Sequence, residues 1–134
     1  MKIFTKVHPA IVLSQLWIFI LFSIFFADFQ WLINASALEE IASGVIRGNE
    51  VTPELLVFAS IVHLIPVVMV TLSRLTVRSV NRWLNLIAGI LVLLMTIGAG
   101  GWDVADQAIL RVAQIIALLL IVWNAWTWKK DEAV

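Results

Sequence analysis

Four long stretches of hydrophobic residues, separated by short polar segments, set the pattern of this chain. They cover approximately residues 10–33, 53–73, 80–97 and 104–128. Because a helix rises about 1.5 Å per residue, roughly 20 apolar residues cross the hydrocarbon core of a bilayer. The pattern therefore predicts an all-α fold, a polytopic four-helix membrane bundle that forms one transmembrane domain over residues 1–134.

The connection between the first two stretches has the pattern of a short helix over residues 37–43. Ser36 and Glu39 have the spacing of a capping box, in which both side chains accept from unpaired backbone N–H groups at the start of a helix. Gly44 suits the left-handed residue that ends one. The apolar side of this segment consists of Leu38, Ile41, Ala42 and Val45. We expect an amphipathic helix that lies along the membrane interface or covers the end of the bundle.

Local signals also mark the ends of the long helices. Pro9 and Pro53 suit the first turn of a helix. Thr52 suits the N-cap of the second helix, and Asp103 that of the fourth. Pro66 lies in the middle of the second helix, where it lacks the backbone N–H that the helix would use, so we expect a kink there.

Charged residues are distributed unevenly between the two ends of the predicted bundle. Seven of the nine basic residues lie at the end that holds the termini: Lys2, Lys6, Arg74, Arg78, Arg82, Lys129 and Lys130. Seven of the nine acidic residues lie toward the other end: Asp28, Glu39, Glu40, Glu50, Glu54, Asp103 and Asp106. Since short cytoplasmic segments of membrane proteins are enriched in Lys and Arg, both termini are expected in the cytoplasm. The helix at 37–43 then lies in the first extracytoplasmic loop.

Composition excludes several classes of function. Hydrophobic residues make up 62% of the chain and charged residues 13%, against about half and about a quarter in soluble proteins, so the lipid bilayer is the expected surrounding. The absence of cysteine excludes disulfide exchange, thiolate metal sites and iron–sulfur clusters. A formal net charge of zero gives no reason to expect a nucleic acid as partner. No catalytic triad or nucleotide-binding motif occurs, so neither an enzymatic activity nor a cofactor or metal site is predicted.

Residues repeated at spacings of three and four predict which helix faces point inward. On the first helix these residues are Ser14, Trp17, Leu21, Phe25 and Asp28. The third helix carries a stripe of small and polar residues, which are Asn81, Asn85, Ala88, Gly89, Val92, Thr96 and Ala99. The polar face of the fourth consists of Asp103, Gln107, Arg111, Gln114, Ala117, Ile121 and Asn124. Small and polar stripes let membrane helices approach closely, so a packing seam is the main interpretation and the lining of a pathway is the alternative.

Polar residues inside the hydrophobic stretches are the candidates for an intramembrane site: Asp28, His63, Asn85, Arg111 and Gln114. A lone charge is costly in this layer, and Asp28 and Arg111 are expected at similar depth on antiparallel helices, so we expect them to form an ion pair. The pair either specifies packing or belongs to an ion- or anion-binding site. His63 is either a proton relay or ligand-holding residue, or a hydrogen-bonded residue of the bundle core.

Several segments resemble a known family. These are LSQLWIFI from Leu13 to Ile20, Phe26-Ala-Asp28, Leu72-Ser-Arg74, and NRWLNLIAG from Asn81 to Gly89. They resemble small prokaryotic four-helix membrane proteins that are classed as a domain of unknown function and are similar in general plan to DoxX-like proteins. The resemblance implies an integral membrane fold and residence in the bacterial inner membrane, and it implies no activity.

Three functions agree with these patterns. The first is a non-enzymatic accessory or structural membrane component that assembles with further copies of itself or with a membrane partner protein. The second is a small ion-coupled transporter or channel subunit that uses Asp28, His63 and Arg111; small multidrug exporters are similar in plan, although Asp28 lies near the end of its helix. The third is a membrane subunit of a redox system, by analogy with DoxX-like proteins, which the absence of cysteine and the presence of only two histidines disfavour.

Overall fold

The structure is a computed structural model that describes residues 7–130; the predicted basic residues Lys2 and Lys6 and the acids Asp131 and Glu132 lie outside this range. It is helical, with one short hairpin. In chain order the elements are α1 (Pro9–Leu32), α2 (Ala35–Ser43), β1 (Val45–Ile46), β2 (Asn49–Glu50), α3 (Pro53–Leu75), α4 (Arg78–Gly98) and α5 (Ala105–Thr127). Four of these helices, α1, α3, α4 and α5, are long and apolar enough to cross a membrane. The predicted helical architecture with four such segments is therefore confirmed.

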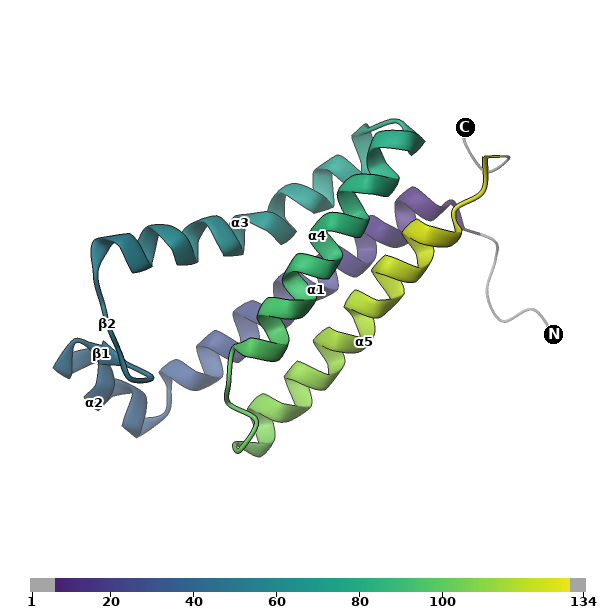
Figure 1. Ribbon diagram of the computed structural model, residues 1–134. Helices are drawn as coiled ribbons and strands as arrows, with labels where there is room; N and C mark the ends of the chain where they lie inside the picture. Colours follow the sequence, from purple (N-terminus) through teal and green to yellow (C-terminus); the bar gives the residue numbers. More distant parts are fainter. Residues whose placement is uncertain (1–6, 131–134) are drawn as a thin grey trace.

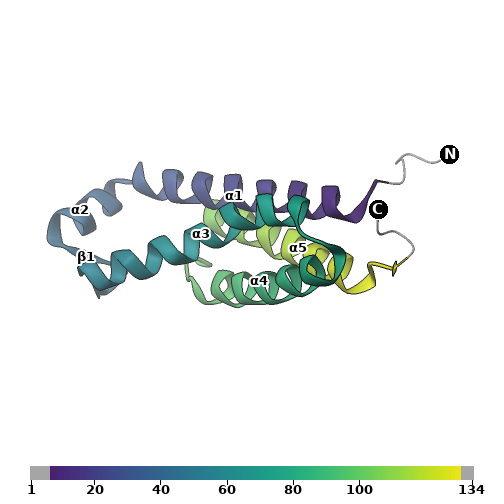
Figure 2. The ribbon, with the colours of Figure 1, turned by 90° about the horizontal axis from the view of Figure 1, so that it is seen from above.

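The four long helices run side by side in alternating directions (Figure 1). α1 packs against α3 and α5, α5 packs against α4, and a smaller contact joins α3 to α4. We call the end that holds α2, the β1–β2 hairpin and the α4–α5 loop the α2 end. The opposite end, where the chain enters α1 and leaves α5, is the terminal end. Figure 2 shows α2 and the hairpin beyond the last turn of α1, with the start of α3 beside them.

The helix ends follow the local signals only in part. His8 accepts from the backbone N–H of Ala10 at the start of α1, and Thr52 accepts from that of Leu55 at the start of α3. The predicted capping box is wrong. Asn34 rather than Ser36 is the N-cap of α2, so this helix begins at Ala35 and its first turn takes up Ser36. Gly44 ends α2 in the left-handed region, as predicted.

The predicted N-cap of the last helix is also wrong. α5 begins at Ala105, and its N-cap is Val104, whose side chain makes no capping hydrogen bond. Gly100 and Gly101 both have positive φ values and turn the chain tightly before the helix. The helix therefore begins one residue later than predicted, and Asp103 lies outside it and is exposed.

The core lies where α1, α4 and α5 face one another. On α1 the buried residues are Leu13, Ser14, Trp17, Ile20, Ser23 and Ala27. The predicted inward face is right at Ser14 and Trp17 and wrong at Phe25, which is 68% exposed at the molecular surface. From Ser14 on, the buried positions recur at spacings of three and then four residues, and Phe25 lies between the buried positions Ser23 and Ala27.

The α4 stripe predicted as a packing seam is buried from Asn81 to Thr96. At Gly89 an added Cβ would lie 3.1 Å from Cγ2 of Val122 and 3.3 Å from Cγ2 of Ile121, both on α5. The backbones of α4 and α5 therefore approach closely because position 89 has no side chain.

Of the four long helices, α3 packs least against the others. No residue from 53 to 65 is buried, whereas Pro66, Met69 and Ser73 are buried closer to the terminal end. Figure 1 shows α3 bending along its length and diverging from α4 toward the α2 end. Pro66 lies inside the helix, where it removes one backbone hydrogen bond and favours such a bend.

Candidate functional site

His63 and Asp28 form a contact between α3 and α1. Nε2 of His63 lies 3.2 Å from Oδ2 of Asp28, and Nδ1 of His63 lies 2.7 Å from the carbonyl oxygen of Ala59. A backbone carbonyl can only accept a hydrogen bond, so Nδ1 carries a proton and donates to it. A neutral imidazole with its proton on Nδ1 has no proton on Nε2, and an ionised carboxylate has no proton to donate.

The contact between Nε2 and Oδ2 therefore requires one further proton, held either as imidazolium with carboxylate or as imidazole with carboxylic acid. Each of these two states is electrically neutral. The Asp28–His63 contact thus joins two helices and has a geometry that suits a shared proton.

The predicted Asp28–Arg111 ion pair is wrong, because the side chain that contacts the Asp28 carboxylate is that of His63. α3 begins beyond the last turn of α1 (Figure 2). Its eleventh residue, His63, therefore lies beside Asp28 near the end of α1.

Arg111 nevertheless shares a cavity with the pair. A cleft of about 190 Å³ contains the side chains of Asp28, His63 and Arg111, and we call it the Asp28 cleft. Its other lining residues are Ile24, Arg47, Val62, Val92, Met95, Thr96 and Ala99. Within residues 7–130 Arg111 forms no ion pair or hydrogen bond, and its Nε is buried. A guanidinium in this setting strongly favours an anion beside it.

Arg47, at the tip of the hairpin, also enters this cleft and was missed by the sequence analysis. Its backbone is left-handed, with φ of 49°, and its N–H donates to Oε2 of Glu40 over 2.6 Å. Its guanidinium donates to the carbonyl oxygen of Ala99 over 3.3 Å and lies 5.4 Å from the ring centre of Trp31. The charge pattern contained one indication of its role. Arg47 and Arg111 are the two basic residues that the sequence does not place at the basic end of the predicted bundle.

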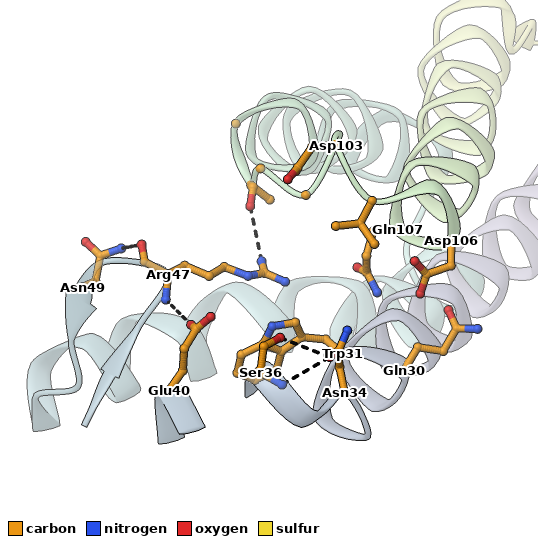
Figure 3. Close-up of a pocket in the computed structure, with 15 residues that line it drawn as sticks. Gln30, Trp31, Asn34, Ser36, Glu40, Arg47, Asn49, Asp103, Asp106 and Gln107 are labelled. Atoms are coloured by element: carbon orange, nitrogen blue, oxygen red, sulfur yellow. Dashed lines mark hydrogen bonds between the residues drawn. The ribbon is translucent and has the colours of Figure 1, made fainter. Parts of the chain in front are cut away.

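A larger polar pocket of about 530 Å³ lies at the α2 end, and we call it the α2-end pocket. Figure 3 shows Arg47 reaching across it from the hairpin, with Gln107 and Asp106 on the far side. Arg47 and Ala99 line both this pocket and the Asp28 cleft. Arg47 and Ala99, whose carbonyl oxygen accepts from the Arg47 guanidinium, therefore lie at the boundary between the α2-end pocket and the Asp28 cleft.

Asn85 belongs to a different part of the molecule. Its Oδ1 accepts from Nε1 of Trp17 over 2.6 Å and from Oγ of Ser73 over 3.2 Å, and its Nδ2 donates to Oδ1 of Asn81 over 2.6 Å. Nδ2 of Asn81 donates to the carbonyl of Ser73 over 2.7 Å. We call these four fully buried residues the Asn85 network. It joins α1, α3 and α4 toward the terminal end and is a packing element, apart from the Asp28 cleft.

Gln114 is fully buried, but neither atom of its amide has a hydrogen-bond partner among residues 7–130. It is not among the residues that line the Asp28 cleft. Gln107, two turns earlier on α5, donates to the carbonyl oxygen of Ala27 over 3.0 Å and joins α5 to α1. Of the five predicted site residues, the structure thus brings three together, Asp28, His63 and Arg111.

Metal binding has no evident place in the described part of the chain. Between residues 7 and 130 no three His, Asp or Glu side chains come close enough to hold a metal ion.

A family model with the description "Family of unknown function (DUF6326)" matches residues 1–134. The chain belongs to this family. No curated protein and no solved structure matches it. The function of this family member is therefore inferred from its own residues and geometry.

Proposed function

We propose that the chain is a small proton-coupled membrane transporter whose coupling site is the Asp28–His63 pair. The observation that carries the proposal is the position of the His63 ring, with Nδ1 2.7 Å from a carbonyl oxygen and Nε2 3.2 Å from a carboxylate oxygen. Such a pair gains and loses one proton, and ionisable residues at membrane depth are commonly part of proton and substrate pathways. No catalytic activity is assigned to the chain.

The arrangement in the membrane is part of the same proposal. α1, α3, α4 and α5 cross the bilayer as a bundle, and the α2 end faces away from the cytoplasm. The described basic residues Arg74, Arg78, Arg82, Lys129 and Lys130 support this orientation, since they gather at the terminal end, whereas α2 and the loops of the α2 end carry acids. The apolar residues Leu38 and Ile41 of α2 are exposed, which agrees with an interfacial helix. The cell membrane, and in a bacterium the inner membrane, is the proposed location.

The cavities support access from the α2 end. The α2-end pocket adjoins the Asp28 cleft at Arg47, while the Asn85 network closes the packing toward the terminal end. A transporter must open the second side in turn, and the bend of α3 near Pro66 is a suitable hinge, because a proline leaves one backbone hydrogen bond unmade. An accessory role does not require Asp28, His63, Arg111 and Arg47 to line one cleft, as they do here.

Proton flux in proteoliposomes tests the proposal. The purified chain is reconstituted into vesicles that contain a trapped pH-sensitive dye, and the decay of an imposed pH gradient is followed with potassium and valinomycin clamping the membrane potential. We expect faster decay with the wild-type chain than with empty vesicles, and loss of the difference in Asp28→Asn and in His63→Ala.

Asn124→Ala is the matched control, because Asn124 is a polar residue of α5 that donates only within its own helix, to the carbonyl of Leu120. This variant should conduct like the wild type. Equal decay in wild-type, Asp28→Asn and empty vesicles would contradict transport. An accessory function would then be favoured if another membrane protein purifies with the chain.

A further inference from the structure

The Asp28 cleft contains more positive than negative charge. Arg111 comes to it from α5 and Arg47 from the hairpin, α1 and α3 contribute Asp28 and His63, and the α4 part of the lining has no titratable group. The Asp28–His63 pair is neutral with its proton and carries one negative charge without it. The cleft is therefore positive in both protonation states, and more positive when the pair is protonated.

The two guanidinium groups of the cleft differ in the partners they already have. That of Arg47 donates to the carbonyl oxygen of Ala99 and lies near the ring of Trp31. Arg111 forms no hydrogen bond or ion pair within residues 7–130, although its Nε is buried. A charged donor in this setting is costly, because nothing replaces the hydrogen bond that water would make to it. A single bound negative charge beside Arg111 removes this cost.

Much of the remaining lining of the cleft is apolar. It consists of Ile24, Val62, Val92, Met95 and Ala99, together with Thr96, whose hydroxyl donates to the carbonyl oxygen of Val92. The volume of about 190 Å³ is several times the share of about 30 Å³ that one water molecule has in the liquid. The cleft thus has room for a small organic anion, and its apolar wall suits a short carbon chain.

The chemistry of Arg111 favours a carboxylate as the charged group of this anion. A guanidinium presents its donors in one plane, and the two oxygens of a carboxylate match that arrangement. A halide or an inorganic phosphate has no carbon chain to contact the apolar wall. One unpartnered guanidinium also calls for one negative charge rather than two.

We propose that the substrate is a small monocarboxylate, which binds Arg111 in the Asp28 cleft through its carboxylate and contacts the apolar lining through its short carbon chain. This inference rests on the proposed transport function and names its substrate class. Protonation of the Asp28–His63 pair removes the one negative charge of the cleft that repels the ligand, so the proton and the anion bind together. One transport step then moves one proton and one monoanion, and no net charge crosses the membrane.

The methyl resonances of methionine in the full chain, in a neutral maltoside detergent, test the proposal. The chain has three methionines, of which Met95 lines the cleft and Met69, buried on α3, does not. Both are labelled with carbon-13 at the methyl group and are assigned from Met95→Leu and Met69→Leu. The probes are propionate, propionamide and chloride at equal concentrations and pH 6. We expect propionate to shift the Met95 resonance until it saturates, with Met69 unchanged, and the other two to shift neither.

Replacing Arg111 tests where the carboxylate binds. Arg111→Gln should weaken propionate binding about tenfold or more, the range for losing a charged hydrogen-bonding partner, and Arg111→Lys should keep part of it. An unchanged Met69 resonance in these variants shows that the packing of α3 is intact. Arg74→Gln is the matched control, because Arg74 is exposed at the terminal end, and it should bind propionate like the wild type.

The coupling to the proton is tested by pH. Propionate binding to the wild-type chain should weaken about tenfold between pH 6 and pH 8.5, because the pair loses its proton and the cleft gains a negative charge. Asp28→Asn removes that charge at every pH. At pH 8.5 it should therefore bind propionate more tightly than the wild type does, although the proposed proton flux is lost in this variant.

Three results would overturn the monocarboxylate proposal. They are a Met95 shift of equal size with propionamide or chloride, no Met95 shift with any probe, and undiminished binding in Arg111→Gln with an unchanged Met69 resonance. Proton flux that depends on Asp28 would survive each of these outcomes, so the two proposals fail separately.

Discussion

Nε2 of His63 lies 3.2 Å from Oδ2 of Asp28, although 35 residues separate the two in the chain. The contact joins α1 to α3 at the place where α3 leaves its packing against α4. Because Nδ1 of His63 already donates to Ala59, the contact depends on one additional proton. The same geometry thus links the packing of two helices to protonation.

A double-mutant cycle between Asp28→Asn and His63→Gln should give a coupling free energy of about 0.5–1 kcal/mol, the range for partly exposed pairs. The side chains of His63 and Asp28 are 52% and 61% exposed at the molecular surface, respectively. Solvent screening of such exposed groups limits the coupling free energy. Coupling should be larger at pH 5.5 than at pH 8.5, because imidazole changes its charge between about pH 5 and 8. Reversible unfolding in mixed micelles, measured at both pH values, provides the four free energies.

The cycle between Asp28→Asn and Arg111→Gln serves as its control. These two residues line one cleft without forming an ion pair, so their effects on the free energy of unfolding should be nearly additive. A larger coupling here than in the Asp28–His63 cycle would mean that Arg111 is the true partner of the carboxylate.

Two glutamines on the same face of α5 should respond differently to replacement by leucine. Gln114→Leu should leave the free energy of unfolding unchanged or raise it by up to about 2 kcal/mol, because the buried amide of Gln114 has no partner in residues 7–130. Gln107→Leu should lower it by about 1 kcal/mol, because the bond to the Ala27 carbonyl is lost. Unfolding of both variants in the same micelles measures the difference, and a marked loss in Gln114→Leu would show that the amide has a partner.

Alanine at two glycines of α4 should separate close packing from helix propensity. At Gly89 the new Cβ lies 3.1 Å from Cγ2 of Val122, so Gly89→Ala should lower stability by about 1 kcal/mol or more despite the better propensity of alanine. At Gly98 nothing lies within 4 Å of the new atom, and Gly98→Ala should be neutral or slightly stabilising. Thermal denaturation followed by tryptophan fluorescence can rank them, and an equal effect at both sites would argue against the close α4–α5 approach.

Trp17→Phe should destabilise the Asn85 network. It removes the 2.6 Å bond from the indole N–H and leaves Oδ1 of Asn85 with Ser73 alone, at a cost of about 1–2 kcal/mol. Trp83→Phe is the control, since Trp83 is on α4 but exposed to the surroundings. Similar losses in the two variants would contradict a specific role of the indole N–H.

The orientation in the membrane can be read by cysteine labelling, because the chain has no cysteine of its own. Glu50→Cys, in the hairpin of the α2 end, should react with an impermeant maleimide added outside intact cells, and Ser79→Cys, at the terminal end, should react only after permeabilisation. Both positions are exposed. The reverse pattern would invert the proposed direction of access to the Asp28 cleft.

The long helices follow from the sequence because each depends on local information. A run of about 20 apolar residues defines a span regardless of its neighbours, and all four observed helices begin and end within two residues of the expected positions. The stripe from Asn81 to Thr96 also lies inward as predicted, since a regular helix places these residues on one face.

The candidate site depended on distance between helices, which the sequence does not encode locally. Asp28, His63 and Arg111 were recognisable one by one, because a charge in a hydrophobic run is rare. Their pairing was mispredicted because it depends on how far α3 is shifted along α1, and α2 with the hairpin sets that shift. Arg47 was missed because it lies in the turn of the hairpin, and the position of that turn over the cleft depends on contacts between distant segments.

The amino-acid pattern was thus sufficient to predict the four apolar helices, the inward seam of α4 and the identity of the charged groups in the hydrophobic stretches. Each of these is a property of residues within a few turns of one another. The three-dimensional packing was needed to show that His63 rather than Arg111 contacts Asp28, that Arg47 lines the same cleft, and that α3 diverges from α4. Axial shift and divergence of helices arise from contacts between distant segments, and a periodic pattern along one helix contains no measure of either.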